Sequence, residues 1–395
     1  MRILQVHNRY RDAGGEDTVV DSEARLLEHA GHEVIRVVHD NPPGSVDAAV
    51  TFVASPWNLR QAARMGSIAR ESGAELAHVH NTWFALSPSV VASLHRAGLP
   101  VVMSLHNYRL LCANGLLFRG GADCRLCIDG SRWSAIRYRC YRGVGGSIVA
   151  ALTQTVAERT GVWKHDVDLF LALSERGRQL FGEGGLDMTK IRVKPHFVLD
   201  PGPRTQAAAS SNEVLYVGRL SIEKGVGRLI EAWRSSQPNL QLRVIGDGPL
   251  RAELERQHSR HVAFSGHLPR EEVSRLMLSS RATVVPSLAR EGQAPNMVIV
   301  EALAAGLPVL AASNLALDIV KELGPRWVVH GAEGGWVRAM SVLTDDHEVV
   351  AASRAARRIY EDNFTPRAAL GALESCYQEA IANHRTHAAS RSSLG

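Results

Sequence analysis

The sequence has few of the features that mark a membrane-spanning, disulfide-stabilised or disordered protein. No apolar run approaches the roughly 20 residues of a transmembrane helix, and the mean hydropathy is −0.09. Only five cysteines occur among 395 residues, which excludes a disulfide scaffold. The hydrophobic fraction of 45% and the charged fraction of 22% are those of a globular protein, so a fibrous or disordered chain is also excluded.

A large excess of one charge is absent as well. Lys and Arg number 45 against 40 Asp and Glu, which gives a formal net charge of +5. That excess is too small to argue by itself for a nucleic-acid partner. The first ten residues hold a short apolar stretch followed by charges and lack the apolar core of a signal peptide. We therefore expect a cytoplasmic protein.

Strand, turn and helix patterns alternate along the first half of the chain. A strand pattern at 3–7 is followed by a glycine-bearing loop at 12–17, a helical pattern that ends at Gly31 and a second strand pattern at 34–38. This order is typical of a βαβ unit. Further strand patterns at 76–79, 101–105 and 169–173 are continuous apolar runs, as in buried parallel strands.

A second set of patterns follows residues 200–212, whose Pro, Gly, Ser and Ala content predicts a linker. Strand patterns recur at 214–217, 242–245, 263–264, 282–285 and 309–312. We predict an α/β protein with an N-terminal domain at 1–199, a C-terminal domain at 213–383 and a disordered tail at 384–395. Ligands bind outside the carboxyl ends of parallel strands, so two such domains facing each other would form a deep cleft.

Two segments of the C-terminal half carry candidate binding residues. Arg219 leaves the end of a strand at Gly218, and Lys224 comes just before a helix. Cations at a strand end and a helix start suit a diphosphate, although solvated surface cations are the alternative. Glu301 lies in an otherwise apolar helix at 297–305. A carboxylate there is costly unless it is paired or exposed in a cleft, where it could accept ribose hydroxyls; the edge of an amphipathic helix is the alternative.

These segments resemble a known family. VIGDGP at 244–249, FSGHLP at 264–269 and EGQAPNMVIVEALAAGLPV at 291–309 are similar to the C-terminal half of retaining glycosyltransferases of family four. GGED at 14–17, HVHN at 78–81, SLHN at 104–107, ALSE at 172–175 and VKPH at 193–196 resemble its N-terminal half. The resemblance implies the GT-B fold, in which two Rossmann-like domains face each other, and a last helix that is a candidate to pack back on the N-terminal domain.

The resemblance also implies roles for individual residues. Arg219 and Lys224 would hold the diphosphate of a nucleoside-diphosphate sugar, and His106 would reach the transferred sugar. The implied catalytic residues are His106, Arg219, Lys224 and Glu291. The implied donor-binding residues are Gly14, Gly15, Gly218, Arg219, Lys224, Gly246, Gly266, His267, Leu268, Gln293, Ala294, Pro295, Asn296, Met297 and Glu301.

The loop before Glu301 departs from the family. The usual register places a glutamate eight positions before Glu301, where this chain has Gln293. Either Gln293 replaces that glutamate, or the loop bulges so that Glu291 reaches the sugar. Glutamine keeps an acceptor and gains a donor but loses the charge, so the donor sugar stays open.

An insertion near 107–145 is rich in cysteine and arginine. Cys112, Cys124, Cys127 and Cys140 could close a structural zinc site, pack as buried thiols or carry redox chemistry. Seven arginines and the aromatic residues Trp133, Tyr138 and Tyr141 lie between 104 and 145. That pattern suits a peripheral contact with anionic lipid at the inner face of a membrane, or a solvated insertion.

We therefore expect a retaining glycosyltransferase that moves a sugar from a nucleoside-diphosphate sugar to a glycan, lipid-linked or small-molecule acceptor. The expected front-face mechanism needs no catalytic cofactor or metal. The D-x-D pair at Asp166 and Asp168 precedes a strand and is interpreted as a cap. Two alternatives stay open: a sugar-nucleotide epimerase that would use His106 and Glu291, and a zinc- or nucleic-acid-binding module.

Overall fold

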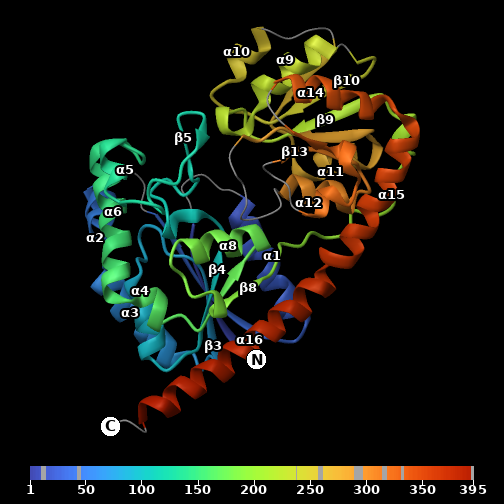
Figure 1. Cartoon of the computed structure of the whole chain (residues 1–395). Coiled ribbons are helices and arrows are strands. Elements are labelled where there is room, and N and C mark those ends of the chain that lie inside the picture. The colour runs from blue at the N-terminus through green and yellow to red at the C-terminus, as the bar shows by residue number, and fades with distance from the viewer. Residues whose placement is uncertain are drawn as a thin grey trace. The chain divides into compact units, whose positions relative to one another are not determined.

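The computed structural model describes residues 1–9, 15–41, 46–236, 238–256, 261–288, 297–313, 318–330 and 333–392. The chain divides into two compact units (Figure 1). The first consists of Met1–Leu117, Cys124–Lys194 and Leu370–Gly395, and the second of Phe118–Asp123 and Pro195–Ala369.

The first unit is built on a six-stranded parallel sheet of order β2-β1-β3-β4-β7-β8. Its strands are β1 (Arg2–Arg9), β2 (Glu33–Asp40), β3 (Leu76–Asn81), β4 (Val101–Leu105), β7 (Leu169–Ala172) and β8 (Ile191–Val193). The inner strands β3, β4 and β7 are buried along their whole length, which explains why they are mainly apolar; the exceptions in β3 are His78, His80 and Asn81.

Helices connect these strands and end at recognisable caps. They are α1 (Gly15–His29), α2 (Val46–Ala54), α3 (Leu59–Glu71), α4 (Ser89–Arg96), α6 (Gly143–Thr160), α7 (Val162–His165), α8 (Glu175–Glu183) and α16 (Pro366–Ser392). The Asn58 side chain accepts a hydrogen bond from the Gln61 amide at the start of α3. Gly161, with φ of 68°, ends α6, because a residue without Cβ adopts this left-handed conformation at no cost.

The C-terminal helix α16 contradicts one prediction. It continues to Ser392, so the expectation of disorder from residue 384 is wrong for 384–392. Leu373 and Tyr377 are fully buried in a cluster with Ile3, Leu27 and Leu171 of the first unit. A helix that is already nucleated propagates readily. The helix therefore extends from these buried residues into the polar segment that follows them.

The cysteine-bearing insertion has little regular structure. It contains a 3-10 turn (Tyr108–Leu110), a two-stranded antiparallel hairpin of β5 (Phe118–Arg119) and β6 (Ala122–Asp123), and the short helix α5 (Ser134–Arg137). Ala135 and Ala150 are buried together with Trp83, so α5 and α6 share a small core with the loop after β3.

The second unit has its own six-stranded parallel sheet, of order β11-β10-β9-β12-β13-β14. Its strands are β9 (Glu213–Val217), β10 (Gln241–Ile245), β11 (Val262–Gly266), β12 (Ala282–Val285), β13 (Val309–Ala312) and β14 (Val328–Val329). Its helices are α9 (Val226–Ser236), α10 (Arg251–Arg256), α11 (Arg270–Ser279), α12 (Met297–Ala304), α13 (Asp318–Lys321), α14 (Glu333–Ala339) and α15 (Asp346–Asn363). Trp233, Trp327 and Tyr360 are the largest of its side chains that are less than 2% exposed.

Residues 200–212, predicted as a linker, are held on the second unit. The Arg204 guanidinium donates to the carbonyl oxygens of Met277 and Ala305, each at 3.2 Å, and of Ser280. Burial lowers the pKa of Arg204 to about 10. Asp200 accepts both terminal nitrogens of Arg357. The local composition predicts a free linker because it carries no information about these contacts, which come from residues distant in the sequence.

Candidate functional site

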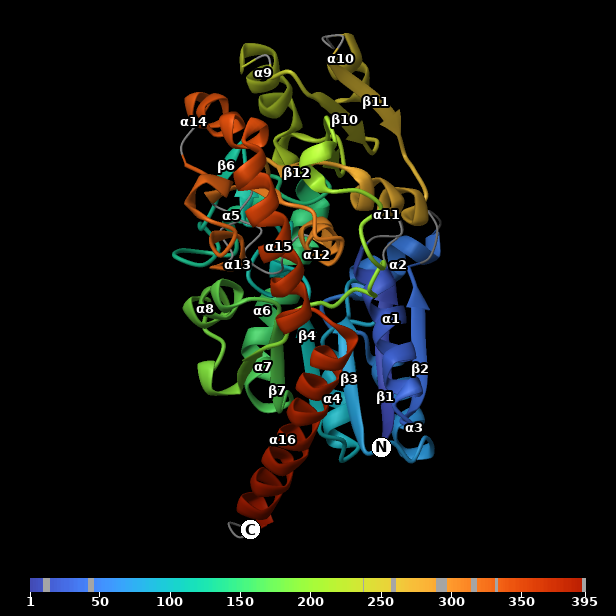
Figure 2. The same ribbon diagram turned by 90° about the vertical axis from the view of Figure 1, so that its right-hand side faces the viewer.

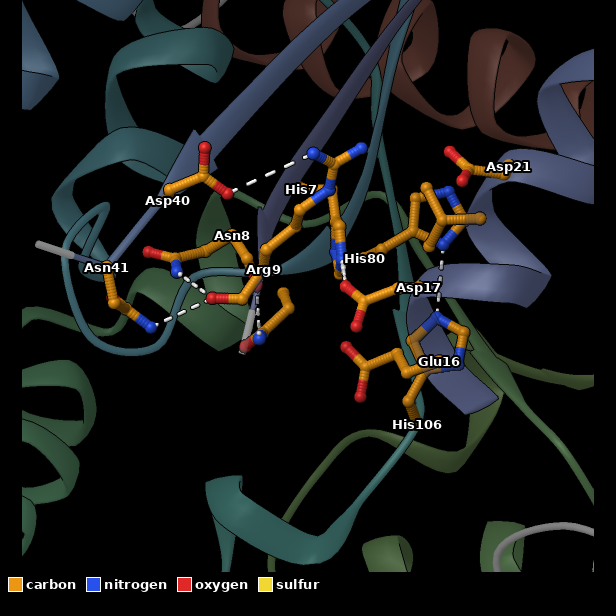
Figure 3. A network of polar contacts seen from close by, with 12 residues as sticks. His7, Asn8, Arg9, Glu16, Asp17, Asp21, Asp40, Asn41, His80 and His106 are labelled. Atoms are coloured by element: carbon orange, nitrogen blue, oxygen red, sulfur yellow. Dashed lines mark hydrogen bonds and ion pairs between the residues drawn. The ribbon is translucent and has the colours of Figure 1, made fainter. Parts of the chain in front are cut away.

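Three histidines gather at the carboxyl edge of the first unit's sheet. His7 lies in β1, His80 in β3, and His106 follows β4 directly. Because these strands are parallel neighbours, their carboxyl ends meet at one edge, where α1 also begins. Figure 3 shows the three imidazoles beside the first turn of α1.

Hydrogen bonds connect this group. His80 Nδ1 lies 3.0 Å from His106 Nε2, and the two rings stack at an interplanar angle of 23°. His7 Nε2 lies 2.8 Å from Asp17 Oδ1. Asn107 donates to Glu16 Oε2 at 3.5 Å. Gly15, predicted to bind donor, is the first residue of α1, whereas Gly14 lies outside the described residues.

A buried charge pair supports His80 from the other side. Glu23 Oε1 lies 3.5 Å from His80 Nε2 and 3.1 Å from His78 Nδ1, and its second oxygen accepts the Lys194 ammonium. All four residues are at most 3% exposed. Tyr377 of α16 completes the network, since its hydroxyl lies 2.8 Å from His78 Nδ1.

The pKa shifts define the charges in this network. Burial alone would raise the pKa of Glu23, but the Lys194 ammonium and His78 hold it well below its usual range. Burial lowers the pKa of His80 well below its usual range, so His80 is neutral. His80 and His106 therefore share one hydrogen bond between neighbouring ring nitrogens, and the other ring nitrogen of His80 lies 3.4 Å from the Gln5 side-chain nitrogen and 3.5 Å from Glu23 Oε1.

A small cavity of about 50 Å³ adjoins His106. Its wall includes Trp83, Arg109 and Gln154. The Arg109 guanidinium carbon lies 5.0 Å from the ring centroids of both Trp83 and Tyr141, within the range of cation–π attraction. Sequence analysis placed Arg109 and Tyr141 in a basic stretch but did not connect them with His106.

In the second unit, glycines lie at the carboxyl ends of the neighbouring strands β9, β10 and β11. Gly218 N donates to Ile245 O at 3.0 Å, and Gly246 N donates to Gly266 O at 2.7 Å. A Cβ on Gly246, which has φ of 134°, would lie 2.0 Å from Gly218 O. The glycines of the predicted donor site therefore allow the strand ends to approach closely, and the Gly218 and Gly246 amides are used between the strands.

The two predicted phosphate-binding cations follow this edge. Arg219 comes directly after Gly218 and is exposed, and Lys224 is half-buried in a 3-10 turn before α9. Gly225 closes that turn with φ of 70°. The Leu288 amide donates to Glu223 O at 2.8 Å, so the loop after β12 holds the turn in place.

Glu301 has a partner that sequence analysis missed. It lies in the second turn of α12, and its Oε1 accepts Arg270 at 2.9 Å from the start of α11. Burial raises the pKa of Glu301, while Arg270 opposes the shift. His267 is exposed beside Gly266, and Leu268 packs on the core. Met297 begins α12. The remaining predicted residues, Glu291, Gln293, Ala294, Pro295 and Asn296, lie outside the described residues.

The cysteines of the insertion are free thiols. A hydrogen bond from Cys127, together with nearby main-chain amides, lowers the pKa of Cys112 to about 6, and the same contact raises the pKa of Cys127. Within the described part of the chain, no three of the predicted zinc ligands Cys112, Cys124, Cys127 and Cys140 bring their sulfurs within 4.8 Å of one another. The geometry therefore gives the zinc hypothesis no support.

Of the helices that the structure describes, none combines the length and apolar character needed to cross a bilayer.

Two α/β units, each built on a parallel sheet, are the components of a GT-B fold. Comparisons with known proteins support this fold. A family model for Glycosyl transferases group 1 matches residues 203–357, and one for a Glycosyl transferase 4-like domain matches residues 14–196. Together the two models match most of the chain and support a glycosyltransferase of the group 1 type.

Individual relatives are distant. The chain is 35% identical over 111 residues to the sulfoquinovosyl transferase SQD2 of Arabidopsis thaliana, covering 28% of this chain and 21% of that protein. It is 29% identical over 204 residues to a glycogen synthase of Mycobacterium tuberculosis, covering 49% of each. The chain thus spans at most about half the length of these relatives. The crystal structure of Anabaena HepE in complex with UDP covers 100% of both chains with a TM-score of 0.64 and 18% identity, which supports the fold.

Proposed function

We propose that this protein is a glycosyltransferase that takes its sugar from a nucleoside-diphosphate donor. The observation that carries the proposal is the edge of the second unit, where the exposed Arg219, the half-buried Lys224 and the start of α9 follow the glycine-bearing end of β9. Main-chain amides, a guanidinium fork and an ammonium group are complementary to a diphosphate. HepE was crystallised with UDP, so UDP is the first nucleotide to test. The two named relatives are a sulfoquinovosyl transferase and a glycogen synthase, which favours transfer over epimerisation.

The proposed reaction is a front-face transfer with retention. The bond between the sugar C1 and the diphosphate oxygen breaks, and a bond from the acceptor oxygen to C1 forms on the same face. The acceptor proton passes to a leaving-phosphate oxygen. Arg219 and Lys224 stabilise the charge that develops on the diphosphate, which is the kind of contribution that usually dominates such catalysis. Glu301 binds the ribose hydroxyls, in exchange for part of its contact with Arg270.

In the first unit, His106 contacts the transferred sugar. His80 is proposed to position it, because His80 Nδ1 lies 3.0 Å from His106 Nε2 and the two rings stack. We also propose that part of the acceptor site is formed by Arg109, Trp83 and Tyr141. Sugar rings pack on aromatic side chains, and the phosphate of a lipid-linked acceptor pairs with a guanidinium group.

Thermal unfolding with added UDP, GDP and ADP tests the donor proposal. Arg219→Ala and Lys224→Ala should each weaken binding of the preferred nucleotide by about 1.5–3 kcal/mol, which is about 10- to 150-fold in Kd. Arg234→Ala is the matched control, because Arg234 is an exposed arginine at the other end of α9. Wild-type affinity in both site variants would refute the phosphate assignment.

The anomeric configuration of the product, read by NMR, tests retention. Turnover that persists in a short assay with chelator would agree with catalysis by the cation pair. The D-x-D aspartate Asp168 lies at the amino end of β7, at the opposite edge of the sheet from His106, and accepts the Val101 amide at 2.7 Å. Immediate loss of turnover, restored by magnesium or manganese, would contradict the proposed mechanism.

We also propose a peripheral membrane contact through α5 and α6. Val144, Ile148 and Leu152 are exposed at intervals of four residues and so form one stripe on α6. Exposed Arg137 and Arg139 lie on and just after α5, which packs against α6. An apolar stripe beside cations suits an anionic bilayer.

Vesicle flotation tests the membrane proposal. Ile148→Ser combined with Leu152→Ser should release the protein from anionic vesicles. Leu199→Ser, which removes an exposed leucine of the second unit, should not. Equal binding to neutral vesicles, or no change in the double variant, would refute the contact.

A further inference from the structure

A second cluster of potential ligands lies at the opposite, amino edge of the first unit's sheet. Asp168 immediately precedes β7, His95 lies in the last turn of α4, and His384 lies on α16. Figure 2 shows α4, β7 and α16 in the same region of this unit. Three elements that are distant in the sequence therefore bring two imidazoles and one carboxylate together.

The ligand atoms lie close to the spacing that a metal ion would impose. His384 Nδ1 is 3.2 Å from Asp168 Oδ2, and His95 Nδ1 is 3.8 Å from the same oxygen. One potential ligand atom from each residue lies within 4.8 Å of the other two. Ligands bound at about 2.0–2.2 Å to a tetrahedral zinc ion are about 3.3–3.6 Å apart. Each histidine nitrogen is therefore within a few tenths of an ångström of this spacing from the Asp168 oxygen.

One nitrogen in the cluster lacks a hydrogen bond. His95 Nδ1 is buried and has no hydrogen-bond partner among the described residues, because 3.8 Å to Asp168 is too long for one. A buried polar atom without a partner calls for an explanation. The His95 and His384 side chains are 11% and 15% exposed, so the cluster is close to solvent and an ion could enter.

The carboxylate is already oriented. Asp168 Oδ2 accepts the main-chain amide of Val101 at 2.7 Å, which is the kind of supporting contact that fixes a ligating carboxylate. The Asp168 carboxylate supplies a negative charge that attracts a cation.

The group formed by Glu23, His78 and His80 has a similar composition but differs in the charge beside its carboxylate and in its access to solvent. The Lys194 ammonium already occupies the Glu23 carboxylate, and the whole group is buried.

We propose that His95, Asp168 and His384 bind a divalent transition-metal ion of the zinc type, with water completing the coordination. Neutral imidazole and carboxylate are ligands that such ions favour. The ion would fasten the end of α16 to the amino edge of the first unit's sheet, so its role is structural. The site is separate from the donor edge and from the His106 network, and it stands whether or not the proposed transfer reaction is right.

Metal titration of the full chain without an added histidine tag tests the proposal. The protein is first treated with chelator and dialysed. Calorimetric titration with zinc chloride should then give a stoichiometry of one zinc ion per chain. At a hundredfold excess over Kd zinc should raise the Tm by roughly 5–10 °C. His95→Ala and His384→Ala should each abolish this rise, measured within each variant with and without zinc so that their own stability does not matter. His347→Ala, which removes an exposed histidine of the second unit, should keep it.

Cobalt substitution identifies the ligands. With nitrogen and oxygen ligands, the cobalt form should absorb visible light without a thiolate charge-transfer band. In a second experiment, tryptic cleavage after the exposed Arg385 should slow when metal is bound. A thiolate band would assign the metal to the cysteines and overturn the proposal. An unchanged zinc response in both histidine variants, or no saturable binding, would overturn it as well.

Discussion

Substitution of Glu23 by glutamine tests the buried network most directly. The substitution keeps the shape of the side chain but removes the charge that Lys194 pairs with, and Lys194 is 1% exposed. An ammonium group left buried without its carboxylate costs about 3–5 kcal/mol. For a unit of about 200 residues this corresponds to a Tm lowered by roughly 6–20 °C.

The rescue variant separates charge from packing. Glu23→Gln combined with Lys194→Met removes the unpaired ammonium group and should recover much of the loss, because an apolar replacement of a buried pair is often neutral. Urea unfolding followed by circular dichroism measures both variants. A loss below about 1 kcal/mol in Glu23→Gln would refute the buried pair. A double variant no more stable than the single one would show that packing, and not charge, dominates.

Three further outcomes are expected. Because burial lowers the pKa of His80, the unfolded chain binds more protons than the folded chain below about pH 6.5, so the free energy of unfolding should fall on acidification by about 1.4 kcal/mol per pH unit for this residue. Urea midpoints between pH 7.5 and 5.5 measure it, and a rise in stability would contradict the assignment. His106→Ala should lower kcat about a hundredfold while the Kd of the nucleotide stays constant, and an equal change in both would remove His106 from the sugar site. Gly246→Ala should cost about 2–4 kcal/mol in urea unfolding, whereas Gly371→Ala, whose Cβ would meet nothing within 4 Å, should cost nothing. Equal effects of the two glycine substitutions would contradict the described strand approach.

Most strands of the two sheets could be predicted because each contains a local apolar stretch. The patterns at 101–105 and 309–312 match β4 and β13, since burial of a parallel strand on both faces favours apolar residues along its length. The short strand β14 has only two residues and leaves no periodic signal, so it was not predicted.

The candidate sites could be predicted only where one segment carries the chemistry. Arg219 and Lys224 stand within one motif, and the comparisons support the family that the motif indicates. The partners of Glu301 and Glu23 could not be found in this way. Arg270 and Lys194 lie on other elements, and a pairing 171 positions apart, such as Glu23 with Lys194, depends on the fold and not on spacing.

The return of α16 to the first unit has a consequence for synthesis. Ile3 and Leu27 share a buried cluster with Leu373 and Tyr377, so the earliest and the latest residues of the chain complete the same core. During translation the first unit therefore keeps an uncovered apolar surface until the second unit has left the ribosome. A nascent chain of this length exposes that surface for many seconds at the usual rate of about 5–20 residues per second, which makes it a natural binding site for chaperones.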